Sequence, residues 1–171
     1  MENILATRRE LLLAPLLAAL PTALLAEAAE AAPNPSMTIV RRPDQIAWQK
    51  QEGFPERSVE QAPLWSRTSD SGLYMTLVRW YPGYMSAPHW YETDRCCVVV
   101  AGVWWVASGD KFDPESTVPA PQGTFVRRVA RTPHYDGVKK DGAEPAVIAI
   151  CGVGPIAFHA TEEGTAGWRR L

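Results

Sequence analysis

The stretch GYMSAPHWYETDRCCVVVAG, residues 83–102, decides the fold. It begins at Gly83, carries a single histidine at position 89 and ends in the apolar run 96–101 before Gly102. A short, valine-rich apolar run that ends at a glycine is typical of a buried β-strand. A second apolar run, 103–108, follows at once, so Gly102 is predicted to sit in a tight β-hairpin.

The rest of the chain shows the same succession of short apolar runs and turns. Residues 109–122 carry three prolines and are predicted to form a long loop, and residues 56–61 are predicted to form one helical turn. Eight or nine short strands, fifteen prolines and seven tryptophans predict an all-β fold, either a sandwich or a closed barrel. The further strands are predicted at residues 37–41, 64–68, 73–81, 124–129, 134–135 and 146–152.

The composition is that of an ordinary globular chain. Of its 171 residues, 46% are apolar and 21% are charged, which allows one hydrophobic core and excludes general disorder. Without residues 1–31, fifteen acidic and fifteen basic residues remain. A chain so close to neutral offers no electrostatic argument for nucleic acid or an anionic membrane as a partner. Neither nucleic acid nor a membrane surface is therefore expected as a partner.

Residues 1–31 differ from the rest and are predicted to be a cleaved export signal. The pair Arg8-Arg9 precedes an apolar run, 11–26, which is followed by alanines of the kind that signal peptidases require. The run contains two prolines and is short for a membrane span, so no stable span is predicted. We favour the twin-arginine type over an ordinary secretory signal. Residues 32–171 then form one exported domain, in the periplasm or outside the cell.

Two segments of the predicted domain share a spacing of glycine and histidine. In the first, Gly83 is followed after five residues by His89, and Gly102 closes the segment. In the second, GTFVRRVARTPHYDGV (residues 123–138), Gly123 precedes His134. These segments resemble the two motifs of the cupin superfamily in order and spacing. The resemblance spans residues 70–155 and implies a jelly-roll β-barrel that commonly pairs into a homodimer.

The resemblance is partial, and its departures concern the metal ligands. Cupins that bind a metal well usually offer three histidines and a glutamate. Tyr91 stands where the second histidine is expected, and Arg95 stands where the glutamate is expected. In the second motif, Val138 takes the place of an asparagine. A guanidinium close to a divalent cation is unfavourable unless an anion lies between them.

Alternate residues of a strand face the same side, so His89, Tyr91 and Arg95 are predicted to project together into the barrel. His134, from a strand across the barrel, would complete this pocket. Two neutral imidazoles suit a divalent metal ion, with no basis for choosing among iron, manganese, zinc, copper and nickel. In the favoured interpretation His89, His134 and a Tyr91 phenolate hold a metal while Arg95 binds an anionic substrate. In the other, the metal site has been lost, and Arg95 and the two histidines bind an organic anion.

The resemblance implies two functions. The first is a metal-dependent oxygenase, isomerase or lyase acting on a small acidic or hydroxylated molecule; in it Arg95 clamps the substrate, and Tyr91 or Asp136 moves a proton. The second is a metal-free, non-catalytic ligand-binding or sensing module. An aspartate before a glycine, as at Asp136, is equally typical of a turn. An immunoglobulin-like sandwich is a third interpretation, and it predicts that His89 and His134 lie far apart on the surface.

The three cysteines are too few for a disulfide framework. Cys96 and Cys97 are adjacent in a predicted strand, so they point to opposite faces. One of them could pair with Cys151 in an oxidising compartment, but small buried apolar side chains are the favoured interpretation. On the same strand Glu92 is predicted to point outward, and His159 is predicted to be an exposed histidine without a role.

Overall fold

The computed structural model describes residues 38–171. Its contacts divide the chain into two units, residues 1–44 and residues 45–171. The described residues of the first unit contain no strand and lead into a 3-10 helix, η1 (Pro43–Gln45), so the strand predicted at 37–41 is wrong in its described part. The predicted export signal, residues 1–31, lies outside the described residues. Within residues 38–171, no helix is long and apolar enough to cross a membrane.

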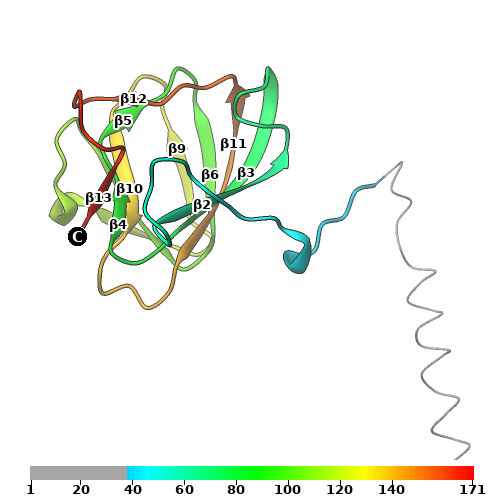
Figure 1. The fold of residues 1–171 in the computed structure, drawn as a ribbon, viewed down its shortest axis with the longest axis horizontal. Coiled ribbons are helices and arrows are strands. Elements are labelled where there is room, and N and C mark those ends of the chain that lie inside the picture. The colour runs from blue at the N-terminus through cyan, green and yellow to red at the C-terminus, as the bar shows by residue number, and fades with distance from the viewer. Residues whose placement is uncertain (1–37) are drawn as a thin grey trace, which may run out of the picture. The chain divides into compact units, whose positions relative to one another are not determined.

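The second unit is built from strands, which confirms the all-β prediction (Figure 1). A second 3-10 helix, η2 (Pro114–Ser116), lies in the connection between β7 and β8. The strands are β1 (Gln49–Lys50), β2 (Val59–Trp65), β3 (Gly72–Trp80), β4 (Tyr84–Ser86), β5 (His89–Trp90), β6 (Arg95–Ala101), β7 (Val103–Ser108), β8 (Val118–Pro121), β9 (Phe125–Arg128), β10 (His134–Val138), β11 (Ala146–Gly154), β12 (His159–Ala160) and β13 (Trp168–Arg170).

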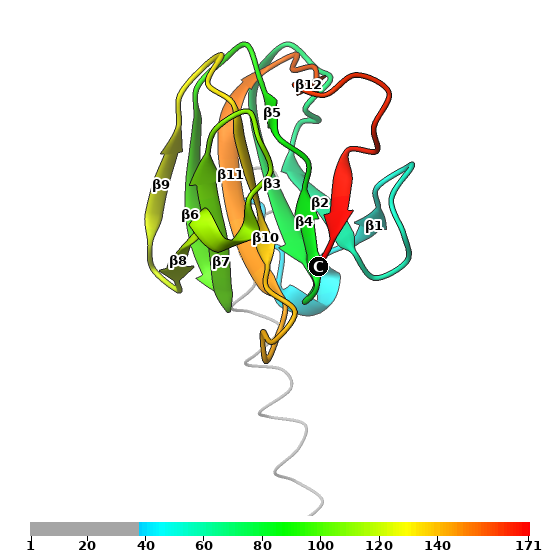
Figure 2. The same cartoon turned by 90° about the vertical axis from the view of Figure 1, so that its left-hand side faces the viewer.

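The strands form two antiparallel sheets that face each other around a common interior (Figure 2). The first sheet has the order β1-β2-β3-β11-β6-β9. The second has the order β12-β5-β10-β4-β13, with β7 attached to β10 and β8 attached to β7. Most neighbours in space are distant in the chain, as in the jelly-roll topology predicted from the motifs.

The core lies between the two sheets because strand residues alternate between its inner and outer faces. In β6, Cys97 and Val99 are buried, while Val98 between them is exposed. Trp104 of β7 and Ile148 of β11 belong to the same buried cluster. Burying each large apolar side chain stabilises the fold by about 1.5–3 kcal/mol, so this alternation holds the two sheets together.

The tight turn predicted at Gly102 is present, but the hairpin is wrong. β6 and β7 follow each other directly, yet β6 pairs with β11 and β9, while β7 pairs with β10 and β8. Gly102 is therefore a corner where the chain passes from one sheet to the other. Its φ is +70°, which favours glycine. A Cβ there would lie 2.5 Å from the carbonyl oxygen of Pro145.

Two other segments also differ from their predictions. Residues 59–61 begin β2 and are not helical, because pairing with both β1 and β3 outweighs local preference. The predicted loop 109–122 contains η2 and β8. Strand β8 pairs only with β7, so its prolines lie on an edge strand, where a missing N–H donor is tolerated.

Replacing Gly102 by alanine is expected to lower the free energy of unfolding by about 2–4 kcal/mol. Alanine disfavours the positive φ of this position, and its Cβ would also clash with the carbonyl oxygen of Pro145. Gly164→Ala is the matched control. Gly164 has φ +72°, but nothing lies within 4 Å of an added Cβ, so only backbone strain of about 1 kcal/mol remains. Urea unfolding followed by tryptophan fluorescence measures both variants, and equal losses would contradict the role of the Pro145 contact.

Candidate functional site

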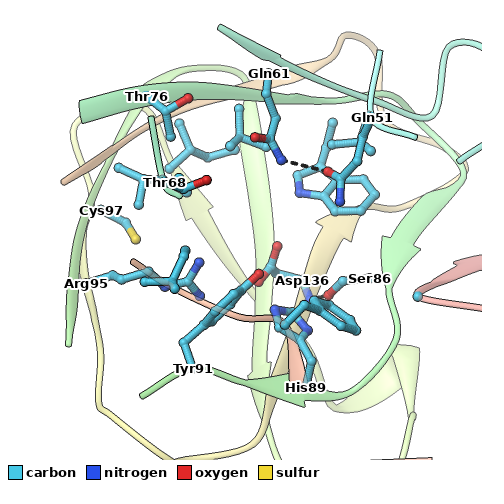
Figure 3. A pocket seen from close by; sticks show the side chains of 18 of the residues that line it. Gln51, Gln61, Thr68, Thr76, Ser86, His89, Tyr91, Arg95, Cys97 and Asp136 are labelled. Carbon is cyan, nitrogen blue, oxygen red and sulfur yellow. Dashed lines mark hydrogen bonds between the residues drawn. The ribbon is translucent and has the colours of Figure 1, made fainter. Parts of the chain in front are cut away.

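A cavity of about 210 Å³ lies between the two sheets, with walls that combine apolar and polar side chains (Figure 3). Four of the predicted site residues line it together: His89, Tyr91, Arg95 and Asp136. The fifth, His134, is not part of the cavity wall. These side chains come from both motif segments, so the fold joins the two segments at one place.

Tyr91 and Arg95 lie at the two ends of a break between strands β5 and β6. β5 ends just before Tyr91 and β6 begins at Arg95, so the uninterrupted strand predicted for this segment is wrong. Within the break, Thr93 donates a 3.0 Å hydrogen bond to the carbonyl oxygen of Val153 and does not face the cavity. The turn between them places the Arg95 guanidinium over the Tyr91 ring, with its central carbon 3.7 Å from the ring centre. A cation over a ring face is attractive.

His134 lies beside His89 and not across the barrel, which corrects its predicted position. β10 pairs with β5, the two histidines are register partners, and their ring centres are 4.5 Å apart. Both are buried, with exposed fractions of 4% for His89 and 2% for His134. The immunoglobulin-like interpretation, which placed them far apart on the surface, is therefore wrong.

The hydrogen bonds of His134 define it as a neutral ring. Its Nδ1 donates to the carbonyl oxygen of Thr132 at 2.9 Å, and its Nε2 accepts from Nη2 of Arg95 at 2.8 Å. An arginine can only donate, so Nε2 must carry a lone pair. Burial, together with the charge of Arg128, lowers the pKa of His134 to about 3. Both of its nitrogens are thus already engaged at neutral pH.

His89 is also neutral, but one of its nitrogens has no such partner. Its Nδ1 donates to the carbonyl oxygen of Ala87 at 2.8 Å, which leaves the lone pair on Nε2. Burial lowers the pKa of His89 to about 4. Its ring stacks on Phe158, with centres 4.5 Å apart and planes 18° apart. At neutral pH, His89 therefore offers the cavity an oriented hydrogen-bond acceptor.

Asp136 is a buried, ionised carboxylate with two fixed partners. Arg128 donates to Oδ2 at 3.0 Å, and the Trp104 indole donates to Oδ1 at 3.1 Å. Burial alone would raise the pKa of Asp136, but the charge of Arg128 and the neighbouring groups outweigh it, and the pKa is lowered. Asp136 lies within strand β10, so the interpretation as a turn-forming residue is wrong.

The buried cluster carries a surplus positive charge. Arg95 and Arg128 are register partners on β6 and β9, with exposed fractions of 8% and 6%. Arg128 has Asp136 as its ion partner, while no carboxylate within residues 38–171 forms an ion pair with Arg95. The Nε atom of Arg95 is buried without a hydrogen-bond partner. Burying a charge without an ion-pair partner and without all of its hydrogen bonds destabilises the folded protein.

Sequence reasoning missed two residues of this cluster, Arg128 and Tyr74. The strand predicted at 124–129 carried a usable signal for Arg128. This residue lies two positions after the inward-facing Val126, so both side chains are expected on the same face. Tyr74 lines the cavity, and its hydroxyl is buried without a hydrogen-bond partner. Burial raises the pKa of Tyr74 to about 12. No feature of the sequence singled out Tyr74, because a tyrosine in an apolar strand is usually core.

The residues present do not fit a divalent cation. An ion shared by the two histidines would need Nε2 of His134, but this atom accepts a hydrogen bond from the positively charged Arg95. Burial raises the pKa of Tyr91, so this side chain is a neutral phenol and not a phenolate. Within residues 38–171, no group of three or more His, Cys, Asp or Glu side chains is arranged to hold a metal ion.

The outward-facing residues are also placed by the structure. Glu92 points away from the cavity, as predicted, and pairs with His159. His159 stacks on Trp90, with ring centres 3.9 Å apart and planes 9° apart. It is therefore a partly buried contact of strand β12, which corrects the prediction of an exposed side chain without a role.

Comparison with known proteins rests on structure alone. No sequence-family model and no curated protein matches the chain. A polyketide cyclase from Streptomyces resistomycificus is similar in structure at a TM-score of 0.63 and 10% identity, over 77% of this chain and 90% of the cyclase. A sugar phosphate isomerase of the cupin superfamily from Silicibacter pomeroyi is similar at a TM-score of 0.52 and 16% identity, over 71% of this chain and 92% of the isomerase.

A cupin-2 domain from Rhodospirillum rubrum is similar at a TM-score of 0.50 and 16% identity, over 68% of this chain and 74% of that domain. The chain has the cupin fold. Identities this low establish the fold alone. The cupin fold also accounts for the motif glycines Gly83, Gly102 and Gly123, because their φ angles of +85°, +70° and +86° place all three in turns that favour glycine.

The two buried histidines predict that the protein loses stability in mild acid. The folded pKa values of about 4 for His89 and about 3 for His134 lie below the unfolded value of 6.5. The unfolded chain therefore binds protons first as the pH falls below 6.5. The contribution of the two histidines to stability is therefore complete above pH 6.5 and is lost as the pH falls toward their pKa values in the folded protein. Between pH 7 and pH 5, each histidine is expected to lower the free energy of unfolding by about 2 kcal/mol.

Urea unfolding at several pH values measures this effect. His134→Gln, which keeps an acceptor for Arg95, is expected to reduce the loss between pH 7 and pH 5 by about half. His159→Gln is the control and is expected to retain the loss, because it leaves both buried rings, His89 and His134, in place. An unchanged pH dependence in His134→Gln would contradict the assignment of His134 as a buried neutral ring.

Proposed function

We propose that this cupin binds a small organic anion in its cavity, with Arg95 as the counter-ion. The observation that carries the proposal is the buried guanidinium of Arg95, which has no carboxylate partner and an unused Nε donor. An anionic ligand would neutralise this charge and accept the unused hydrogen bond. Charge-assisted hydrogen bonds of this kind are about twice as strong as neutral ones.

Two neighbours support the placement of the anion. The Tyr91 ring and Nε2 of His134 hold the guanidinium plane of Arg95, so little side-chain entropy is lost when a ligand binds. The hydroxyl of Tyr74 is a second buried donor without a partner, and it lies within electrostatic influence of Arg95. We assign Tyr74 and Arg95 as joint donors to the anionic group.

The other residues that line the cavity indicate the chemistry of the rest of the ligand. His89 offers the lone pair of Nε2, which suits a hydroxyl group that donates a hydrogen bond. Trp104, Ile148 and Phe158 provide apolar surface around it. A volume of about 210 Å³ is below that of most pockets for drug-sized molecules. We infer a compact hydroxylated acid with a flat or branched apolar body.

A catalytic role is the second candidate. The structural neighbours described above include a cyclase and an isomerase, and a cavity with an acceptor histidine beside a phenol resembles a proton-transfer site. In this version His89 takes a proton from the ligand and Tyr91 gives one to it, and a proton then passes from His89 to the Tyr91 phenolate to restore both side chains, without a metal. His89→Gln separates the two candidates, because glutamine keeps the acceptor but cannot take up a proton. A pure binding role predicts unchanged affinity in this variant, and a catalytic role predicts loss of turnover.

The central test uses 4-hydroxybenzoate as the probe and its neutral analogue 4-hydroxybenzamide as the comparison, with affinities measured by isothermal titration. The wild-type protein is expected to prefer the acid by tenfold or more, because only the acid neutralises Arg95. Arg95→Met is expected to abolish that preference.

Arg127→Met is the matched control for this test, because Arg127 lies on the neighbouring strand β9, is exposed and is paired with Asp94 outside the cavity. It is expected to leave both affinities unchanged. Equal affinities of the wild-type protein for acid and amide would contradict the proposal.

Metal removal tests the metal-dependent interpretation, in which an oxygenase, isomerase or lyase would use His89 and His134 as ligands. Dialysis against a chelator is expected to leave the affinity for 4-hydroxybenzoate within twofold, because Arg95 supplies the positive charge. Metal content by mass spectrometry and titration before and after dialysis check this. One metal equivalent per chain, whose removal abolishes binding, would contradict the metal-free proposal.

Two further expectations stay predictions. The homodimer implied by the cupin resemblance is tested by the mass of the protein in solution. Export through a twin-arginine signal is tested by fractionation of cells that produce the full chain, with Arg8→Lys and Arg9→Lys as the comparison.

A further inference from the structure

Cys96 and Cys151 are brought together on the outer face of the first sheet, so the favoured interpretation of small buried side chains is wrong for these two cysteines and holds for Cys97. They are register partners on the neighbouring strands β6 and β11. Both side chains are exposed and both thiols are free. Cys97, one residue away, is 1% exposed and lines the cavity on the opposite face. The chain therefore carries one outward-facing cysteine pair and one buried cysteine.

The backbone geometry of this pair suits a disulfide bond. Directly opposite residues of an antiparallel pair have Cα atoms about 4.5 or 5.5 Å apart, depending on the hydrogen-bond pattern. Disulfides span Cα distances of about 4.4–6.8 Å. The Cα separation expected for this register pair therefore lies in the range that a disulfide can bridge.

The three cysteines differ in reactivity for structural reasons. Burial raises the pKa of Cys97 to about 11, so its thiol is unreactive near neutral pH. Cys96 is exposed and has Arg127 as its register partner on β9. An exposed sulfur is accessible to an oxidant in solution, whereas the buried sulfur of Cys97 is not. Oxidation should therefore select Cys96 and its partner Cys151.

We propose that Cys96 and Cys151 form a reversible disulfide between β6 and β11 when a small-molecule disulfide, such as oxidised glutathione, is the oxidant. The thiolate of one cysteine attacks the oxidant, forms a mixed disulfide and releases one reduced glutathione. The second thiolate then attacks the protein sulfur of that mixed disulfide and releases the other glutathione. The protein loses two protons and two electrons, which together are two hydrogen atoms, and one oxidised glutathione becomes two reduced molecules.

This cross-link lies directly beside the cavity. The neighbouring register pair on the same two strands is Arg95 and Gly152. Gly152 also has Tyr74 of β3 as its register partner, and a Cβ at Gly152 would approach the Tyr74 hydroxyl to 2.7 Å. Oxidation of the pair would thus restrain β6, which carries Arg95, and β11, which lies between Arg95 and Tyr74, although the disulfide itself does not depend on the proposed function.

The test oxidises the full chain with oxidised glutathione and measures the intact mass under denaturing conditions. The wild-type protein is expected to lose two hydrogens, to bind one alkylating reagent afterwards, at Cys97, and to yield a 96–151 cross-linked peptide. Dithiothreitol is expected to restore three reactive thiols. The oxidised form is expected to melt about 5 °C or more above the reduced form, because the cross-link closes a long loop.

Three variants make the assignment specific. Cys97→Ala is expected to form the same cross-link, whereas Cys96→Ser and Cys151→Ser are expected to retain one glutathione on the remaining outer cysteine. Stable glutathione adducts on both outer cysteines of the wild-type protein would overturn the proposal. A disulfide that includes Cys97, or one that joins two chains on a non-reducing gel, would also overturn it.

Discussion

A guanidinium without a carboxylate of its own organises the interior of this barrel. Arg95 is buried against the Tyr91 ring and donates to Nε2 of His134. Asp136, the carboxylate of this buried cluster, forms its ion pair with Arg128 and not with Arg95. The surplus positive charge and the burial together keep both histidines neutral, because a further cation would be poorly solvated and repelled. The arrangement suits an anion better than a divalent cation.

The two sheets create this cluster by joining distant segments. Strands β5 and β10 place His89 beside His134, and strands β6 and β9 place Arg95 beside Arg128. Each of these pairs unites one residue of the first motif with one residue of the second. The corner at Gly102 allows this, because it sends the chain from one sheet to the other within a single residue. The alternating apolar side chains of the strands then pack between the two sheets and bury the cluster.

The departures from the cupin motifs change the chemistry that the fold can perform. A bound metal ion supplies positive charge together with open coordination positions. A guanidinium at the place of the glutamate supplies charge and directed hydrogen bonds, but it cannot accept ligands. The site is therefore suited to recognise and orient an anion, with His89 as the acceptor for a neighbouring hydroxyl. Any proton transfer here would rely on the side chains alone.

The all-β class was predictable from the sequence, because local alternation and turn residues act over a few positions. The jelly-roll topology was implied by the resemblance of two glycine–histidine spacings to the cupin motifs, and the inward placement of Tyr91 and Arg95 was predicted from a continuous strand that is in fact broken between them. The tertiary structure was needed to place His134 beside His89 and Arg95, to pair Asp136 with Arg128, to bring Tyr74 to the cavity and to show which of the two adjacent cysteines meets Cys151. Those contacts depend on which strands pair and in which register. That choice is made by burial over the whole sheet, and no short stretch of residues carries it.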